Sequence, residues 1–249
     1  VIIDSAEVSG DLIAGGLGCV DDPTDSHTAT YNTVNIGGDY AIDDVSLYGA
    51  YVYVDFGEDP SVNDDLFTGN TLNFDASLKT NTTTVGQVAN FETINLRAGE
   101  VASGAIILEA TGGAILGDGN SKGTTVNLLS VDTGSLDAGN YITLISNADG
   151  TLANEGQKQF VPISDSVALG YNGEVALDDT ENKVVFNIES KGITPKTKVL
   201  NESRAAEMAF LNSASDLLQD QDIHKAGKHV FGAERGIYNK YKTGSSVDL

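Results

Sequence analysis

The run Thr71-Leu72-Asn73-Phe74 decides the fold class of this 249-residue chain, because its pattern returns further along the sequence. It recurs 22 residues later as Thr93-Ile94-Asn95-Leu96 and again, more loosely, as Thr125-Val126-Asn127-Leu128. In each run an asparagine stands between two apolar residues, as in a strand that buries one face. A repeat at about 20 or more residues is typical of solenoid rungs, each of which buries its apolar row against its neighbours.

Short strands separated by Gly, Asn, Asp and Ser account for the rest of the sequence before Pro195. β-Branched and aromatic residues alternate with polar ones in these segments, and none keeps a helical period. The predicted strands are 33–36, 45–54, 71–74, 93–96, 105–110, 124–131, 141–146 and 183–188. We therefore predict an all-β fold, a right-handed parallel β-helix (solenoid) followed by a C-terminal α-helix. A β-sandwich with ordinary hairpin turns is the alternative.

Charge divides the chain into two segments. Residues 1–190 hold 29 acidic and 5 basic side chains, a balance of -24, whereas residues 191–249 hold 7 and 9, a balance of +2. The change falls near Lys191-Gly192-Ile193-Thr194-Pro195, where Gly and Pro also interrupt the pattern. We expect two parts with different roles to join there.

The second segment begins with a helical pattern. Residues 197–222 contain neither Gly nor Pro, and Met208, Leu211, Ser215 and Leu218 form a narrow apolar stripe. The predicted helix of 26 residues would extend about 39 Å, and it is far too polar to face lipid. It either packs on its own domain or projects toward a partner. The alternation from residue 230 to 249 predicts one or two further strands.

Composition excludes several classes of function. The net charge of -22 argues against nucleic acid and anionic membranes as partners. The single cysteine, Cys19, excludes an internal disulfide framework and multi-cysteine zinc sites. No run approaches the roughly 20 apolar residues of a membrane-spanning helix. The start Val1-Ile2-Ile3-Asp4-Ser5 lacks signal-peptide features, so we expect the numbering to begin inside a longer precursor.

Three stretches together resemble the C-terminal part of a bacterial autotransporter of the type V secretion family. Residues 67–73 and 88–95 look like the last rungs of a passenger β-helix. Residues 200–206 with 209–217 are similar to the linker helix that threads the outer-membrane barrel of the family. Residues 241–248 are close to the segment that opens that barrel. The last two, in this order and spacing, are the more specific pair.

The resemblance implies three parts: residues 1–192 as passenger rungs with an autochaperone-like folding region, 193–227 as linker helix, and 228–249 as the incomplete start of the translocator barrel. Only 27 residues follow Asp222, too few for the smallest barrels of about 8 strands. The implied role is that of a surface-exposed passenger fragment, which folds outside the cell, templates passenger folding and tethers the passenger to the barrel. The implied location is the bacterial cell surface and outer membrane, or the extracellular space after release.

The partner that the resemblance implies is the chain's own outer-membrane translocator barrel, absent from this chain. A virulence-associated adhesin module that binds a host-surface or glycan ligand is a further hypothesis, which the sequence does not separate from a pure scaffold. A secreted carbohydrate-active β-helix enzyme is the alternative function. An enzyme of that class would need a groove lined by carboxylates with a basic partner.

No residue is predicted to be catalytic or to bind a cofactor or metal, so we expect no enzyme activity. His27 lies in the loop Asp25-Ser26-His27-Thr28 with no Gly-x-Ser-x-Gly nearby, and His224 and His229 flank the predicted end of the helix, so none is assigned to a catalytic triad. Adjacent strand residues point to opposite faces, so the pairs Asp43-Asp44, Asp64-Asp65 and Asp178-Asp179 read as solvated turns. Arg97 and four lysines are the only cations of residues 1–190.

Several acidic loops are candidates for calcium binding. Gly117-Asp118-Gly119-Asn120 resembles one turn of a repeats-in-toxin loop, but the repeating family of such loops is absent. Asp21, Asp22 and Asp25 could supply oxygen ligands, as could Asp55, Glu58 and Asp59, although neither set has EF-hand spacing. We assign no calcium site. Some autotransporters are cut within the linker helix, but neither Asn201 nor Asn212 is assigned as a cleavage site.

Overall fold

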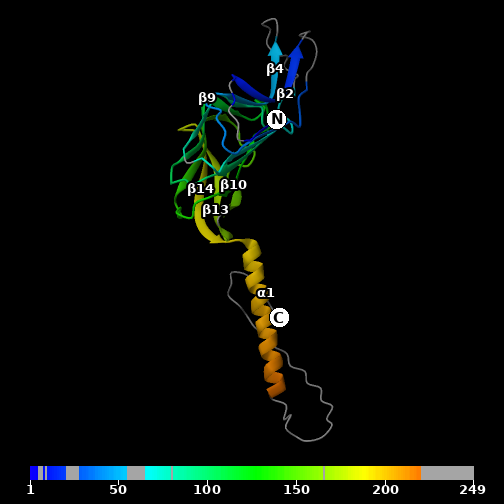
Figure 1. Cartoon of the computed structure of the whole chain (residues 1–249), viewed down its shortest axis with the longest axis vertical. Coiled ribbons are helices and arrows are strands. Elements are labelled where there is room, and N and C mark those ends of the chain that lie inside the picture. Colours follow the sequence, from blue (N-terminus) through cyan, green and yellow to red (C-terminus); the bar gives the residue numbers. More distant parts are fainter. Residues whose placement is uncertain are drawn as a thin grey trace. The chain divides into compact units, whose positions relative to one another are not determined.

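The computed structural model describes residues 1–4, 8, 10–20, 28–54, 65–79, 81–164 and 166–219. The chain divides into two compact units, Val1–Gly192 and Ile193–Leu249. Strands build the described part of the first unit, and one long helix lies in the second (Figure 1).

The strands of the first unit are as follows. They are β1 (Ile2–Asp4), β2 (Leu12–Val20), β3 (Thr33–Gly37), β4 (Ser46–Val54), β5 (Thr71–Ala76), β6 (Thr83–Val85), β7 (Val88–Ala89), β8 (Thr93–Ala98), β9 (Ile106–Leu116), β10 (Thr125–Val131), β11 (Tyr141–Gly150), β12 (Lys158–Ile163), β13 (Ser166–Asp178) and β14 (Lys183–Ile193).

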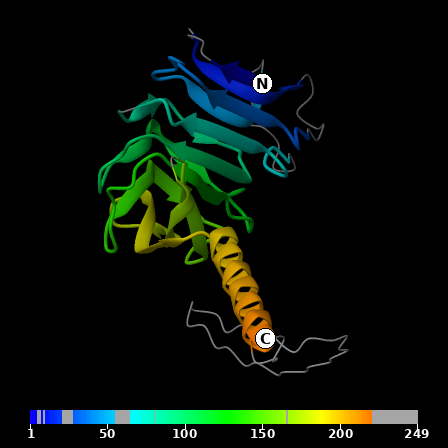
Figure 2. The same ribbon diagram turned by 60° about the horizontal axis from the view of Figure 1, so that its bottom comes forward.

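These strands form two parallel stacks, and the chain alternates between them. The first stack has the order β1-β3-β5-β8-β10, and the second has the order β2-β4-β7-β9-β11. Figure 2 shows the strands lying in successive layers from the N-terminal end onward. Parallel neighbours need crossover connections, so the predicted alternative of a hairpin sandwich is wrong. The all-β prediction is confirmed, as one long, mostly parallel sheet that is not closed.

The repeat that suggested a solenoid sets the register of the first stack. Thr71 pairs with Thr93, and Thr93 pairs with Thr125, so the three runs lie level. The run Thr33–Ile36, predicted as a strand but not as a repeat, is a fourth copy in register with β5. Its inward side chains continue two apolar rows that are at most 2% exposed. These rows are Val34, Leu72, Ile94 and Val126, and Ile36, Phe74, Leu96 and Leu128.

At the C-terminal end of the stacks, the strand pairing changes from parallel to antiparallel. β12 pairs antiparallel with β13, and β11 pairs antiparallel with β14. β10 meets β12 only at Val131 and Ile163, so most of its outer edge lacks a strand partner. Two side-chain amides occupy that edge instead. Asn154 bonds both N–H (3.1 Å) and C=O (2.8 Å) of Val126, and Gln159 bonds both groups of Leu128 (3.4 and 2.7 Å).

All eight strands predicted from the sequence are confirmed, with shifted ends, and six others were missed. β2 was missed because it contains glycines, which lower strand propensity. A Cβ on Gly15 would lie 2.7 Å from the carbonyl oxygen of Gly49, so only glycine fits where these two strands meet. β12 contains Pro162, and β13 contains Gly170 and Gly173. β1, β6 and β7 are too short to give a periodic signal.

The predicted helix is confirmed as α1 (Pro195–Gln219). Thr194 caps it, because the hydroxyl of Thr194 accepts a hydrogen bond of 3.1 Å from the N–H of Thr197. Pro195 occupies the first helical position, where a missing N–H costs nothing. The apolar side chains of Met208 and Leu211 are 64% and 58% exposed. The strands predicted within 230–249, like His224 and His229, lie outside the described residues.

In the described part of the chain, no helix is both long enough and apolar enough to cross a membrane.

Candidate functional site

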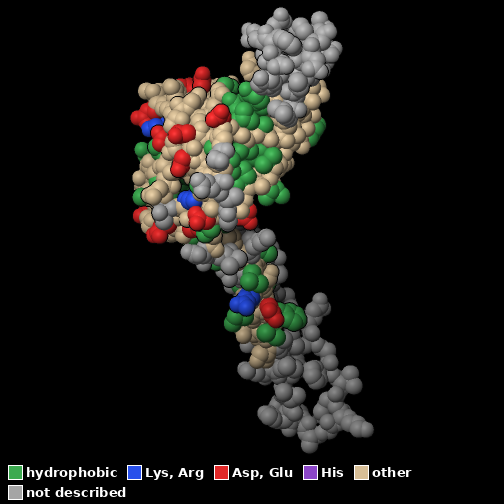
Figure 3. Space-filling view, turned by 45° about the horizontal axis from the view of Figure 1, so that its top comes forward, with side chains coloured by type: hydrophobic (Ala, Val, Ile, Leu, Met, Phe, Trp, Pro, Cys, Tyr) green, Lys and Arg blue, Asp and Glu red, His purple; other side chains and the backbone are tan. Residues whose placement is uncertain are grey.

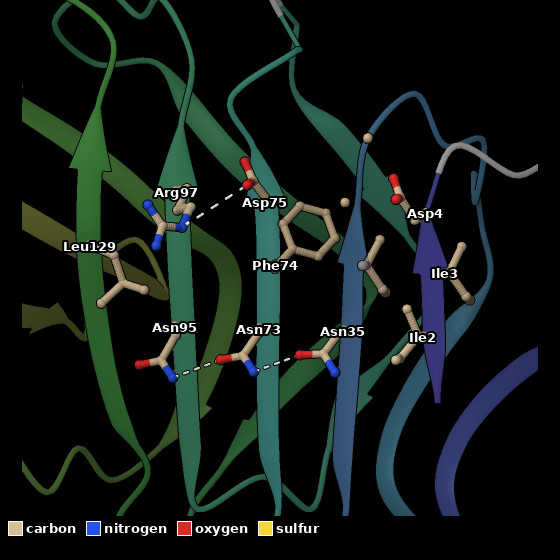
Figure 4. A pocket seen from close by; sticks show the side chains of 13 residues that line it. Ile2, Ile3, Asp4, Asn35, Asn73, Phe74, Asp75, Asn95, Arg97 and Leu129 are labelled. Carbon is tan, nitrogen blue, oxygen red and sulfur yellow. Dashed lines mark hydrogen bonds and ion pairs between the residues drawn. The ribbon is translucent and has the colours of Figure 1, made fainter. Parts of the chain in front are cut away.

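A groove on the outward face of the first stack, lined by both polar and apolar side chains, is the candidate functional site. It encloses about 360 Å³ and crosses strands β1, β3, β5 and β8 (Figure 4). Because strand residues alternate between faces, the side chains opposite the buried apolar rows are carried into this groove. The lining includes Ile2, Asp4, Asn35, Gly37, Asn73, Asp75, Asn95, Arg97 and Leu129.

A ladder of asparagine amides runs along the floor of the groove. The Nδ2 of Asn73 donates to Oδ1 of Asn35 (2.7 Å), and the Nδ2 of Asn95 donates to Oδ1 of Asn73 (2.9 Å). Asn127 extends the ladder beyond the groove with a bond of 3.0 Å to Asn95. An amide can make four hydrogen bonds, and these ladder bonds use one donor and one acceptor of Asn73 and Asn95. Each of these two therefore keeps one N–H and one lone pair outside the ladder.

Charged side chains form a second row beside the ladder, and Figure 4 shows Arg97 and Asp75 directed toward each other. The Nε of Arg97 lies 4.0 Å from Oδ2 of Asp75, with the side chains 49% and 41% exposed. The Nη1 of Arg97 also donates to Oγ of Ser130 at 3.4 Å. A half-exposed pair at this separation is weak, so each group can exchange this partner for a ligand, while Oδ1 of Asp75 also accepts the N–H of Ser77 at 2.9 Å.

The depth of the groove comes from a glycine. Gly37 pairs with Asp4 of β1 and stands next to Asp75 of β5, so this row lacks a side chain at its centre. A Cβ on Gly37 would meet only Cβ of Asp75, at 3.4 Å, and the backbone has no positive φ there. A side chain would therefore fit the backbone at Gly37 and fill the groove.

Apolar side chains flank the groove at both ends. Ile2 of β1 is 78% exposed, and Leu129 of β10 is 37% exposed. The β8–β10 register shifts between Leu128 and Ser130, which turns Leu129 outward as an extra residue. The groove thus combines a hydrogen-bonding floor with an apolar surface at either end.

The first unit as a whole carries a large excess of acidic side chains. Figure 3 shows Asp and Glu side chains scattered over one face of the first unit, with few Lys or Arg among them. This agrees with the excess of 29 acidic over 5 basic side chains in residues 1–190. The field of such a surface repels polyanions.

The predicted acidic pairs do not form a site in the structure. Asp43 and Asp44 are exposed, and Asp44 has a left-handed φ of 63°. Asp65 accepts hydrogen bonds from the N–H groups of Thr68 (2.9 Å) and Phe67 (3.2 Å), and the bond from Thr68 chiefly lowers the pKa of this carboxyl. Asp178 accepts the N–H of Thr180 and of Glu181 in a turn, next to exposed Asp179. His27 and Asp64 lie outside the described residues.

The glycine-rich loop at Asp118 is likewise a turn. One carboxylate oxygen of Asp118 accepts the N–H groups of Lys122, Asn120 and Ser121 at 2.8–3.0 Å. These bonds, that of Lys122 foremost, lower the pKa of Asp118. The acidic residues 21, 22, 25, 55, 58 and 59 fall outside the described residues. Elsewhere in the described ranges, no three His, Cys, Asp or Glu side chains gather as metal ligands would.

Sequence reasoning noted Arg97 and the asparagine repeat but did not join them into a groove. The signal that could have done so is the two-residue step from Asn73 to Asp75 and from Asn95 to Arg97, which places each pair on one face. Comparison with known proteins gives no match: no family model, no curated protein and no solved structure is significantly similar to this chain.

Proposed function

We propose that this chain is the C-terminal part of an autotransporter passenger, a right-handed parallel β-helix whose C-terminal end folds first and templates the stacking of the rungs before it. The proposal assigns it no enzymatic role. It places the chain at the bacterial cell surface, joined through its helix to an outer-membrane translocator barrel. The sequence resemblance and the alternation of the chain between two parallel stacks support it.

The capping of the C-terminal end by side-chain amides carries the proposal. The amides of Asn154 and Gln159 occupy the outer edge of β10, and antiparallel strands follow. At the other end of the stacks, β1 and β2 are the terminal strands of the sheet. A solenoid grows by adding rungs to an existing surface, and only the N-terminal end of these stacks offers strands to which a further rung can add.

The sequence separation between contacting residues supports folding of the C-terminal region first. Antiparallel β12 and β13 bring Lys158 beside Glu174, 16 residues away, whereas the ladder asparagines are 22 to 38 residues apart. Closing a shorter loop costs less conformational entropy, and local contacts speed folding. The C-terminal region is therefore the natural nucleus.

The helix supports a tethering role. Met208 and Leu211, three residues apart on one helix face, expose most of their side chains, and such water-facing apolar groups favour burial against a partner. We propose the lumen of the translocator barrel as that partner.

Two tyrosines test the folding order. Tyr171 in β13 is fully buried, donates to the carbonyl of Thr133 (2.8 Å) and accepts the N–H of Leu136 (3.2 Å). Tyr40 near β3 is also buried and bonds the hydroxyl of Thr83 (3.1 Å). Tyr171→Phe and Tyr40→Phe thus make the same chemical change in opposite regions. Stopped-flow refolding of the full chain measures both.

We expect Tyr171→Phe to slow refolding and Tyr40→Phe chiefly to speed unfolding, because only interactions formed in the transition state change the folding rate. Each change should destabilise the protein by about 1 kcal/mol, enough for the comparison. Slower refolding by Tyr40→Phe with none by Tyr171→Phe would reverse the proposed order. The family assignment has its own test: a reading frame that continues after Leu249 without a barrel-encoding region contradicts it.

A carbohydrate-active enzyme is the second candidate, and the groove favours it. Asp4, Asp75 and Arg97 supply carboxylates with a basic partner, as that class requires. Incubation with polysaccharides and measurement of released reducing ends or unsaturated products tests it. Turnover that is lost in Asp75→Asn would establish the enzyme and remove the non-enzymatic proposal.

A further inference from the structure

We infer that the groove over β1, β3, β5 and β8 binds a linear, uncharged oligosaccharide, laid across the strands along the asparagine ladder. This goes beyond the folding role and does not depend on it. Four features carry it: the spacing of the amides, their fixed orientation, the mixed charges beside them and the net negative charge of residues 1–190.

The spacing of the ladder suits a chain of sugar rings. Neighbouring strands lie about 4.7–4.9 Å apart, so Asn35, Asn73 and Asn95 offer amides at that interval. This interval is comparable to the length of one pyranose unit in an extended glycan. Asn73 and Asn95 each present a donor and an acceptor outside the ladder, and a sugar hydroxyl can use both.

The ladder is fixed before any ligand binds. Each amide is held by its neighbour at 2.7–2.9 Å, so little side-chain freedom is lost on binding. Asp75 and Arg97 stand directly beside it and are each about half exposed. A carboxylate accepts two vicinal hydroxyls, and a guanidinium donates to ring or hydroxyl oxygens. Ile2 and Leu129 offer apolar surfaces for the C–H faces of the terminal rings.

Charge and geometry exclude other occupants. The balance of -24 over residues 1–190 repels sulfated or uronic polysaccharides. A peptide that adds as a strand needs unpaired backbone groups at a sheet edge. The floor of this groove is instead a sheet face, in which the backbones of β3, β5 and β8 pair with one another.

Isothermal titration of the full chain with four β-1,4-linked hexasaccharides tests the inference. The probes are cellohexaose, xylohexaose, mannohexaose and chitohexaose, with a heparin hexasaccharide as the polyanion. We expect at least one uncharged probe to bind and to shift the side-chain amide signals of Asn35, Asn73 and Asn95 in ¹⁵N-labelled protein, and the heparin fragment not to bind. Binding of heparin alone, or of no probe at millimolar concentration, overturns the inference.

Variants locate the binding. Gly37→Ile fills the groove without removing an interaction, and Arg97→Gln removes its cation, so each should weaken binding at least tenfold. Asn187→Ala changes an outward asparagine of β14, outside the groove, and should leave affinity unchanged. Circular dichroism confirms that each variant is folded. Unchanged affinity in both groove variants overturns the site. The refolding order, measured without ligand, is independent of these results.

Discussion

At the scale of single residues, asparagine serves two purposes in this protein. Asn73 lies on the outward face and bonds its equivalents in the neighbouring strands. Asn70 is completely buried, and its side chain accepts two bonds from Asn32 and donates to the carbonyls of Ala29 and Leu66. Apolar flanks on both sides predicted that Asn73 faces outward. Nothing near Asn70 in the sequence predicts its partners, because two of them lie about 40 residues away.

Tyr40 gives a prediction at alkaline pH. Burial raises the pKa of Tyr40 to about 12, against 10 in the unfolded chain. Its contribution to stability is complete below pH 10 and is lost as pH rises from 10 to 12, because the unfolded state ionises first. At pH 11 the loss is about 1 kcal/mol. Urea unfolding at pH 8 and pH 11 should show a smaller alkaline decrease for Tyr40→Phe than for the parent chain; an equal decrease contradicts this origin.

At the scale of the element, the edge of β10 is protected by side chains. Replacing Asn154 and Gln159 together by Ala leaves the backbone groups of Val126 and Leu128 without these partners. Unpaired strand edges associate with one another. We expect the double variant to unfold at lower temperature and to form dimers or larger species by light scattering. Gln157→Ala, an exposed position in the same segment, is the control and should stay monodisperse. A monodisperse double variant of unchanged stability would contradict the capping role.

Elements were predictable where local chemistry decides them. The helix was predictable from the run without glycine or proline that follows Pro195, and β5 and β8 from their alternation of apolar and polar residues. β2 could not be found, because its glycines are set by the close approach of β4. The groove depends on the register that brings Gly37 beside Asp75, and on the shift at Leu129. Both are properties of paired strands and are absent from any one segment.

At the scale of the whole molecule, repulsion among the acidic side chains destabilises the folded state. Residues 1–190 carry 29 acidic and 5 basic side chains, so added salt should stabilise the fold by screening their repulsion. We expect the urea midpoint to rise between about 10 and 300 mM NaCl, where the screening length falls below roughly 10 Å. Asp43→Asn with Asp179→Asn, two exposed carboxyls, should reduce the slope. A midpoint that does not rise with salt would contradict this balance.

The intervals between ladder asparagines are 38, 22 and 32 residues, yet the amides stay in register. Differences of up to 16 residues per turn are therefore absorbed away from the ladder, and lengthening a connection adds only slowly to its entropic cost. Connections of different lengths can thus join the strands while the ladder keeps its register. Such a molecule can lengthen or shorten the segments between its strands without having to evolve a new fold.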